Sequence, residues 1–267
     1  MIRLTALLLA TAAISTPALA ADFYGNQTAA VDMYQAPASD WTGFYVGGFA
    51  GGAFNPSSAG VIEIDEDLDG DFSEPLAGPL AAAFGSNFIG SHDGGFLGGI
   101  EAGYDHQMGQ FVVGGVIDIG YVDFQDRQSG FSSTPASYTQ VSELGWLGTI
   151  RARGGYLVTE DVLAYVHGGL AIGDTSFSFE STNPNGVSRG GSSTSVGFQV
   201  GAGVEAKIQE NWSVGVEYAY TNLGDTDFTT RFANGPFAGV NPAGADLRGS
   251  DDMFDFHTVK ATLKYRF

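Results

Sequence analysis

The feature that most constrains this chain is a two-residue alternation of apolar and polar side chains, which recurs in eight segments. Near the end of the sequence, for example, Val259 and Leu263 alternate with Lys260 and Lys264. Such alternation predicts β-strands with one apolar and one polar face. The segments that show it are residues 41–54, 94–107, 110–124, 141–158, 161–173, 194–207, 211–222 and 255–267.

The connections between these segments alternate in length. Four are long, at residues 55–93, 125–140, 174–193 and 223–254, and three are tight turns near residues 108–109, 159–160 and 209–210. Transmembrane β-barrels have long loops outside the cell, short turns in the periplasm and an even number of strands. We therefore predict an all-β fold, an eight-stranded antiparallel up-and-down transmembrane β-barrel with both termini in the periplasm.

The N-terminal region has the pattern of a secretory signal. Arg3 is followed by an apolar run over residues 4–14 and by the small residues Ala18-Leu19-Ala20, which predicts cleavage after residue 20. Residues 21–40 are polar and lack a period, so a periplasmic lead-in is expected before a barrel over residues 41–267. No later segment approaches the roughly 20 apolar residues of a spanning helix. The absence of cysteine excludes disulfides and a lipid-modified cysteine.

Aromatic residues fall near the ends of several predicted strands, where the interfacial girdles of a membrane barrel lie. The residues expected in these girdles are Trp41, Tyr104, Tyr121, Tyr156, Trp212, Tyr220 and Tyr265.

Charged residues follow the face opposite the apolar one. The chain has 11 basic and 30 acidic residues and a net charge of −19, which argues against nucleic-acid binding. Acids and bases nevertheless alternate with the apolar, lipid-facing residues of the same predicted strands, a relation called here strand parity, which places them together in the lumen. The acids are Glu101, Asp118, Glu143, Glu205 and Glu217, and the bases are Arg151, Arg153, Lys207, Lys260, Lys264 and Arg266. Charges withdrawn from water need partners, so pairs such as Asp118 with Arg151 and Glu217 with Lys260 are expected.

This predicted network has two interpretations. It is either a structural ion-pair network that fills the barrel or the lining of an ion path. Eight strands enclose an interior just wide enough for side chains, which favours the structural interpretation.

The first long loop carries an acidic cluster with the spacing of the first part of a calcium loop. Asp65, Asp67, Asp69 and Asp71 alternate, and Gly70 suits a sharp turn. The final bidentate position falls on Leu76 rather than on a carboxylate. Calcium is therefore one hypothesis, and the other is a solvated acidic loop that repels lipopolysaccharide.

Chemistry at the outer rim has few candidate groups. Two histidine–carboxylate pairs could contribute to a catalytic site there, His92 with Asp93 and His257 with Asp255. The sequence near them contains no motif of a strained nucleophile. His106 lies by a predicted periplasmic turn and is expected to be solvated. The sequence therefore predicts a protein that is not an enzyme.

Three motifs resemble a known family. They are DWTGFYVGG at residues 40–48, AYVHGGLA at residues 164–171 and VEYAYTNLG at residues 216–224. They are similar to the opening, fifth and seventh strands of the opacity-type, or "porin family", outer-membrane β-barrel proteins of alphaproteobacteria, which are small eight-stranded surface antigens. The ending, with Leu263, Tyr265 and Phe267 alternating, resembles the signal recognised by the barrel-assembly machinery. His167, where a small hydroxyl residue is expected, and the acidic first loop depart from the family pattern.

The resemblance implies varied functions, among them envelope stability, surface antigenicity, adhesion, haemin binding and pore formation. We expect an outer-membrane structural and surface protein that contacts lipid and lipopolysaccharide and presents its loops for surface contacts. The alternatives are a narrow channel for small solutes or ions, and a loop-mediated binder of haemin or a cation.

Overall fold

The computed structural model describes residues 40–267, except for residues 58, 184–188, 226–228 and 252. The predicted signal sequence and nearly all of the predicted lead-in lie outside the described residues. Within the described part of the chain, no helix combines the length and the apolar character needed to cross a membrane.

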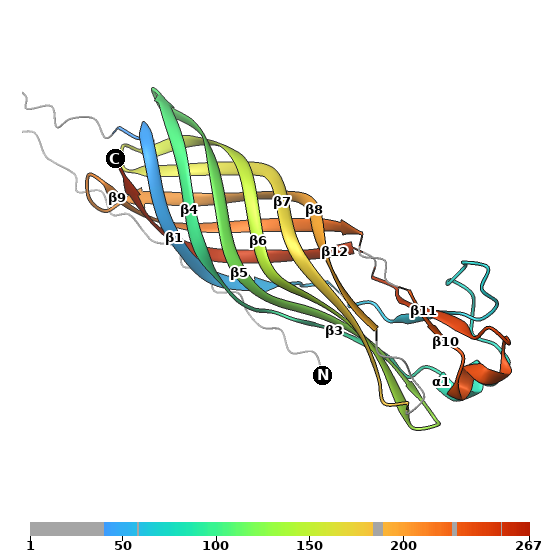
Figure 1. Cartoon of the computed structure of the whole chain (residues 1–267). Helices are drawn as coiled ribbons and strands as arrows, with labels where there is room; N and C mark the ends of the chain where they lie inside the picture. The colour runs from blue at the N-terminus through green and yellow to red at the C-terminus, as the bar shows by residue number, and fades with distance from the viewer. Residues whose placement is uncertain (1–39, 58, 184–188, 226–228, 252) are drawn as a thin grey trace, which may run out of the picture. The chain divides into compact units, whose positions relative to one another are not determined.

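Eight antiparallel strands close into a ring (Figure 1). They are β1 (Gly43–Phe54), β4 (Gly95–Met108), β5 (Phe111–Ser132), β6 (Ala136–Thr159), β7 (Val162–Ser181), β8 (Arg189–Lys207), β9 (Trp212–Asp225) and β12 (Met253–Arg266). Each strand pairs with the next around the ring, and β1 closes it by pairing with both β4 and β12. The predicted eight-stranded up-and-down barrel is thus confirmed.

The alternation in the sequence sorts side chains between the two faces of the ring. Ile100 and Ile117 lie on neighbouring strands, β4 and β5, and are exposed on the outer face, whereas the directly opposed pair Glu101 and Asp118 faces the lumen. Successive residues of a strand point to opposite faces, so one register fixes both surfaces at once. The tight turns lie together at one end of the barrel, called here the short-turn end, and the other end is the long-loop end.

Strands β5 to β8 continue well past the length of a transmembrane strand. β6 has 24 residues, whereas roughly 9–11 tilted residues cross a membrane. The prediction of a loop over residues 125–140 is therefore wrong, because β5 and β6 stay paired until Ser132 meets Ala136. The cause is that residues 125–140 keep the two-residue alternation in polar form, with Gln128 opposite Gln140.

The first and last long connections fold into a small structure of their own at the long-loop end, called here the cap. It contains a three-stranded sheet of β2 (Ile62–Asp65), β11 (Ala245–Gly249) and β10 (Thr230–Phe232), with helix α1 (Gly78–Phe84) and the 3-10 helix η1 (Gly235–Gly239). Leu80, Phe84 and Phe237 are fully buried in its core. Tyr138 and Phe179, from the extended parts of β6 and β7, complete this core and join the cap to the barrel.

A further strand, β3 (Phe88–Asp93), pairs with β5 directly beyond the stretch of β5 that pairs with β4. Gly94 joins β3 to β4, and a Cβ at this position would collide with the carbonyl oxygen of Ala53. The close approach of the backbones therefore requires glycine at this break.

Candidate functional site

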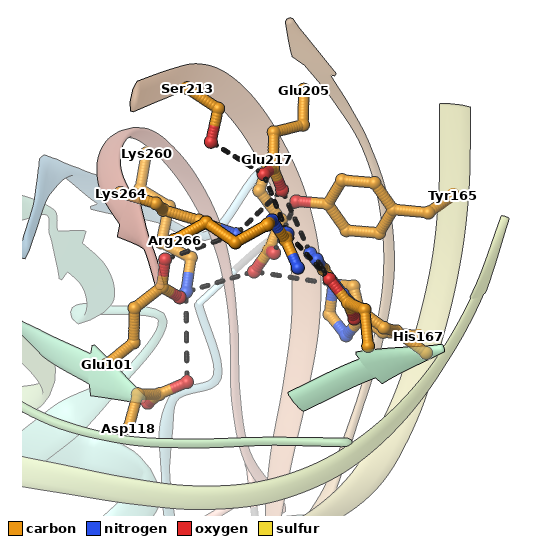
Figure 2. Close-up of polar contacts among 12 residues, drawn as sticks. Glu101, Asp118, Tyr165, His167, Glu205, Ser213, Glu217, Lys260, Lys264 and Arg266 are labelled. Carbon is orange, nitrogen blue, oxygen red and sulfur yellow. Dashed lines mark hydrogen bonds and ion pairs between the residues drawn. The ribbon is translucent and has the colours of Figure 1, made fainter. Parts of the chain in front are cut away.

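The lumen is layered along the barrel. At the short-turn end it is filled by an apolar cluster of Trp41, Val112, Leu157, Leu163 and Tyr165. Toward the long-loop end it is filled by a larger apolar cluster that includes Leu97, Phe124, Leu144, Leu223 and Phe256. The charged residues occupy the space between these two layers, where side chains from different strands converge (Figure 2).

One group of charges is centred on Arg151. Its guanidinium pairs with Asp118 and with Glu217, whose Oε1 lies 2.7 Å from Nη1. Lys260 lies 2.9 Å from the same Glu217 oxygen and 3.9 Å from Asp118. The expected pairs Asp118–Arg151 and Glu217–Lys260 are both present. The Thr149 hydroxyl also donates to Asp118, at 2.7 Å.

The second group is centred on Arg153, nearer the short-turn end. Its guanidinium pairs with both carboxylate oxygens of Asp105 and, at 3.0 Å, with Glu205. Lys264 lies 3.0 Å from Glu205 and 3.2 Å from Glu101, and Arg266 lies 2.7 Å from Asp105. Every carboxylate in this group therefore faces at least one cation, as burial of charge requires.

Neutral donors and aromatic rings complete the network. The Tyr165 hydroxyl donates to Glu217 at 3.0 Å, and Ser213 donates to Glu205 at 2.7 Å. His167 lies 3.4 Å from Glu217 and contacts Arg151, so the histidine that departs from the family pattern belongs to the network. The Arg153 guanidinium stacks between the rings of Tyr45 and Tyr165, at 4.8 and 5.1 Å from their centroids. Such stacking stabilises a desolvated cation.

Three expectations about where side chains lie are wrong. Glu143 is exposed and outside the network, because the register shifts between Leu144 and Trp146 and thereby inverts the parity of the strand beyond that point. Trp41 is fully buried rather than in an interfacial girdle, with its ring under Lys207 and Arg266 and its indole N–H donating to the carbonyl of Glu160. Lys207 accordingly lies at the mouth of the barrel rather than within the network.

Asp105 is a network residue that is absent from the lumen charges predicted from the sequence. It is fully buried and accepts hydrogen bonds from Arg153 and Arg266. Asp105 lies four residues after Glu101 on the same strand, so the two side chains share a face, and the alternation alone would have predicted that Asp105 faces the lumen.

The charged layer leaves almost no free space. A cavity of about 20 Å³ lies beside Asp118 and Lys260, which is room for about one water molecule. The guanidinium of Arg151 and the carboxylate of Glu205 have side-chain exposures of 0%. This arrangement resembles a protein core more than an aqueous path.

The acidic cluster of the first loop is only partly assembled. Asp65, Asp67 and Asp69 each offer a carboxylate oxygen within 4.8 Å of the others, whereas Asp71 is not in this group. The carboxylate of Asp65 accepts hydrogen bonds from the backbone N–H groups of Leu68 and Gly70, at 2.7 and 2.9 Å. The loop is thus held by its own backbone around Asp65.

The charges of this loop repel one another at its surface. The neighbouring carboxylates of Asp67 and Asp69 raise the pKa of Glu74, whereas hydrogen bonds from Ser73 lower the pKa of Asp71. Asp71 is thus satisfied by Ser73, and the repulsion centres on Asp67 and Asp69. Glu74 lies beside this trio rather than at the final position of a calcium loop.

The three residues of the expected assembly signal lie on the outer face of β12 and just beyond it. Leu263 is 47% and Phe267 72% exposed. The ring of Tyr265 packs between those of Trp212 and Phe267, each with its centroid 5.2 Å away. These residues are therefore accessible to lipid or to another protein at the outer face of β12.

Comparison with known proteins gives the chain a family. Residues 6–267 match the outer membrane protein beta-barrel domain. The 31 kDa outer-membrane immunogenic protein of Brucella melitensis is 31% identical over 265 residues, which cover 96% of each chain. The 22 kDa outer membrane protein of Rhizobium leguminosarum bv. viciae is 32% identical over 192 residues, which cover 72% of this chain and 69% of that protein.

Among solved structures, the outer membrane protease OmpT of Escherichia coli aligns with a TM-score of 0.43 and 11% identity, over 84% of this chain and 97% of that one. This structural similarity is weak, and the family assignment comes from the sequences. The expected resemblance to alphaproteobacterial outer-membrane proteins is confirmed. The chain is an outer-membrane protein that belongs to the outer membrane protein beta-barrel domain family.

Proposed function

We propose that this protein is a structural and surface component of the outer membrane, which stabilises the envelope and presents its long-loop end for surface contacts. One observation carries the proposal: the barrel is filled by a paired-charge layer between two apolar layers, while the long connections build an ordered cap with its own core. A filled barrel serves as an anchor, and an ordered cap serves as a recognition surface. The names of the immunogenic relatives agree with surface exposure.

On this proposal the cap faces the cell exterior and both termini lie in the periplasm, with the outer apolar face in contact with lipid and the last strand read by the barrel-assembly machinery. The absence of cysteine makes a direct test available. Ser133→Cys at the long-loop end and Gln209→Cys at the short-turn end are both exposed positions. A membrane-impermeant maleimide should label Ser133→Cys on intact cells and Gln209→Cys only after permeabilisation. The reverse pattern would reject the proposed orientation.

The competing function is a narrow channel for ions or small solutes. The side-chain-filled lumen supports the anchor over the channel, because conduction through it would require displacement of Arg151 or Arg153 from their carboxylates. We therefore expect purified protein in planar bilayers to show no steady conductance. A stable channel of about one nanosiemens, too large for a lumen filled by side chains, would reject the anchor proposal in favour of the pore.

We also propose that the protein is not an enzyme. Among the hydrogen bonds of the described residues, no histidine pairs with a serine hydroxyl, and the His257 ring instead contacts the Tyr218 hydroxyl at 2.6 Å. Incubation of the purified protein with a library of fluorogenic peptides should release no signal above that of a heat-unfolded sample. Cleavage that survives repurification would contradict the proposal.

Calcium binding by the first loop is a second candidate function, and the grouping of Asp65, Asp67 and Asp69 favours it. Calorimetric titration with calcium should then release heat that is lost in the variant Asp67→Asn/Asp69→Asn. Absence of heat at about 1 mM calcium, a concentration at which weak extracellular sites fill, would favour a solvated acidic loop that holds no metal.

A further inference from the structure

A second group of potential metal ligands lies where the barrel extension meets the cap. His92, Asp126 and Asp251 each offer one ligand atom, and these three atoms lie within 4.8 Å of one another. His92 comes from β3, Asp126 from the extended part of β5, and Asp251 from the connection between β11 and β12. The pairing of β3 with β5 places His92 directly opposite Asp126.

The histidine of this group is buried without a hydrogen bond. The side chain of His92 is 6% exposed and that of Asp126 is 9% exposed. Within the described residues, neither ring nitrogen of His92 makes a hydrogen bond, and Oδ1 of Asp126 also lacks one. Buried polar atoms left in this way each carry a desolvation cost, which a bound ligand removes.

The distance between the two buried donors matches metal coordination. Nδ1 of His92 lies 3.4 Å from Oδ1 of Asp126, which is long for a hydrogen bond. In a tetrahedral zinc site with bonds of about 2.0–2.1 Å, two ligand atoms are separated by about 3.3 Å. The pair is therefore already spaced as two corners of such a site.

Neighbouring side chains hold these donors in place. Phe124 stacks on the His92 ring, with centroids 6.2 Å apart and 19° between planes. The buried amide of Gln128 donates to Oδ2 of Asp126 at 3.3 Å and to the Asp251 carbonyl at 3.4 Å, and it accepts from the Asp251 N–H at 3.3 Å. One glutamine thus fixes one acidic ligand and the backbone of the other, as outer-shell residues of metal sites do.

Glycines allow the first and the last long connections to pack closely against Gln128. A Cβ at Gly60 or at Gly249 would lie 2.6 Å from the Gln128 amide group. The Val61 N–H then donates to the Ser250 hydroxyl at 2.9 Å, and the Ser250 N–H donates to the Val61 carbonyl at 2.8 Å. The first and last long connections therefore meet beside the group.

We propose that His92, Asp126 and Asp251 form a binding site for a divalent transition-metal ion of the zinc type. One imidazole and two carboxylates match the nitrogen and oxygen ligands that zinc accepts, and three protein ligands leave one position for water or for a donor from outside. The bound ion joins β3, β5 and the β11–β12 connection, so it fastens the cap to the barrel extension. The site is separate from the acidic loop of Asp65, Asp67 and Asp69.

The test uses the full-length mature chain, folded in detergent micelles, stripped with a chelator and titrated with zinc chloride in a calorimeter. Wild type should bind one zinc ion per chain. His92→Gln and Asp126→Asn should each weaken zinc binding at least tenfold, and Gln128→Ala should weaken it about 10- to 100-fold. His106→Gln is the matched control, because His106 is an exposed histidine near a tight turn at the short-turn end, whereas the proposed ligands lie at the long-loop end. This variant should bind zinc as wild type does.

Two further measurements distinguish zinc binding at His92 from zinc binding at the acidic loop. The variant Asp67→Asn/Asp69→Asn should bind zinc normally, whereas loss of zinc binding in it would assign the metal to the acidic loop and overturn the proposal. In wild type alone, zinc should slow hydrogen exchange at residues 88–93 and 249–251, a readout that needs no substituted protein. Absence of zinc binding at about 0.1 mM, far above the concentration at which a three-ligand site fills, would also overturn the proposal. So would equal affinity in wild type and in folded His92→Gln.

Discussion

Arg153→Met provides a quantitative test of the lumen network. The methionine keeps the apolar stem of the side chain and removes the guanidinium, which donates to both oxygens of Asp105 and to Glu205. Removal of one partner from a buried ion pair costs about 3–5 kcal/mol. Asp105 keeps Arg266 and Glu205 keeps Lys264, so the lower value, about 3 kcal/mol, is expected.

Urea unfolding of the purified barrel in lipid vesicles, followed by tryptophan fluorescence, measures this cost. With an m value of about 3 kcal/mol per molar urea, the midpoint should fall by about 1 M. Arg231→Met is the matched control, because the Arg231–Asp246 pair is exposed on the cap and should leave the midpoint unchanged. A loss below about 1 kcal/mol for Arg153→Met would refute the view that these charges are buried and interdependent.

Three further predictions concern packing and assembly. Gly197→Ala should destabilise the barrel by about 1–3 kcal/mol in the same assay, because its Cβ would collide with the carbonyl oxygen of Asn222, whereas Gly191→Ala on the same strand meets open space and should not. Phe84→Ala should make the cap sensitive to protease while the barrel stays intact, since the ring is fully buried in the cap core, and equal protease resistance would contradict a separate core. Phe267→Ser should reduce the amount of barrel inserted into the outer membrane of cells, and normal insertion would exclude a role for this ring in assembly.

Much of the lumen followed from the sequence because strand parity is a local property. Once two neighbouring segments are strands with a short turn between them, the turn fixes their register and the register fixes which residues oppose. The opposition of Glu101 to Asp118, across the turn between β4 and β5, follows in this way. Glu217 opposes Lys260 across β9 and β12, which a long connection separates in the sequence, so no turn fixes their register. The same local rule failed at Glu143, because the register shifts between Leu144 and Trp146 and the alternation alone does not mark the position of a bulge.

The cap and its connection to the barrel depended on contacts that no local pattern records. Residues 125–140 are polar enough to suggest a loop, yet they form a hairpin of β5 and β6. In this hairpin β5 pairs with β3 on its other side, and β6 pairs with β7. Tryptophan is a residue type common at membrane interfaces, so the sequence suggested that place for Trp41. Trp41 is instead buried under Arg266, a residue from the opposite end of the chain.

The sequence by itself determined the class of the fold, the number of barrel strands, the two faces of the barrel and the inward direction of most lumen charges, because periodicity and turn length act between residues that are neighbours in the chain or across one hairpin. Beyond the two predicted pairs, Asp118–Arg151 and Glu217–Lys260, the partners of the lumen charges come from strands that only the closed ring brings together. Only the tertiary structure decided the ordered cap and the juxtaposition of His92, Asp126 and Asp251. These residues come from three separate segments, and their approach depends on ring closure together with the docking of the first connection against the last. Such long-range contacts form only when the whole chain has folded.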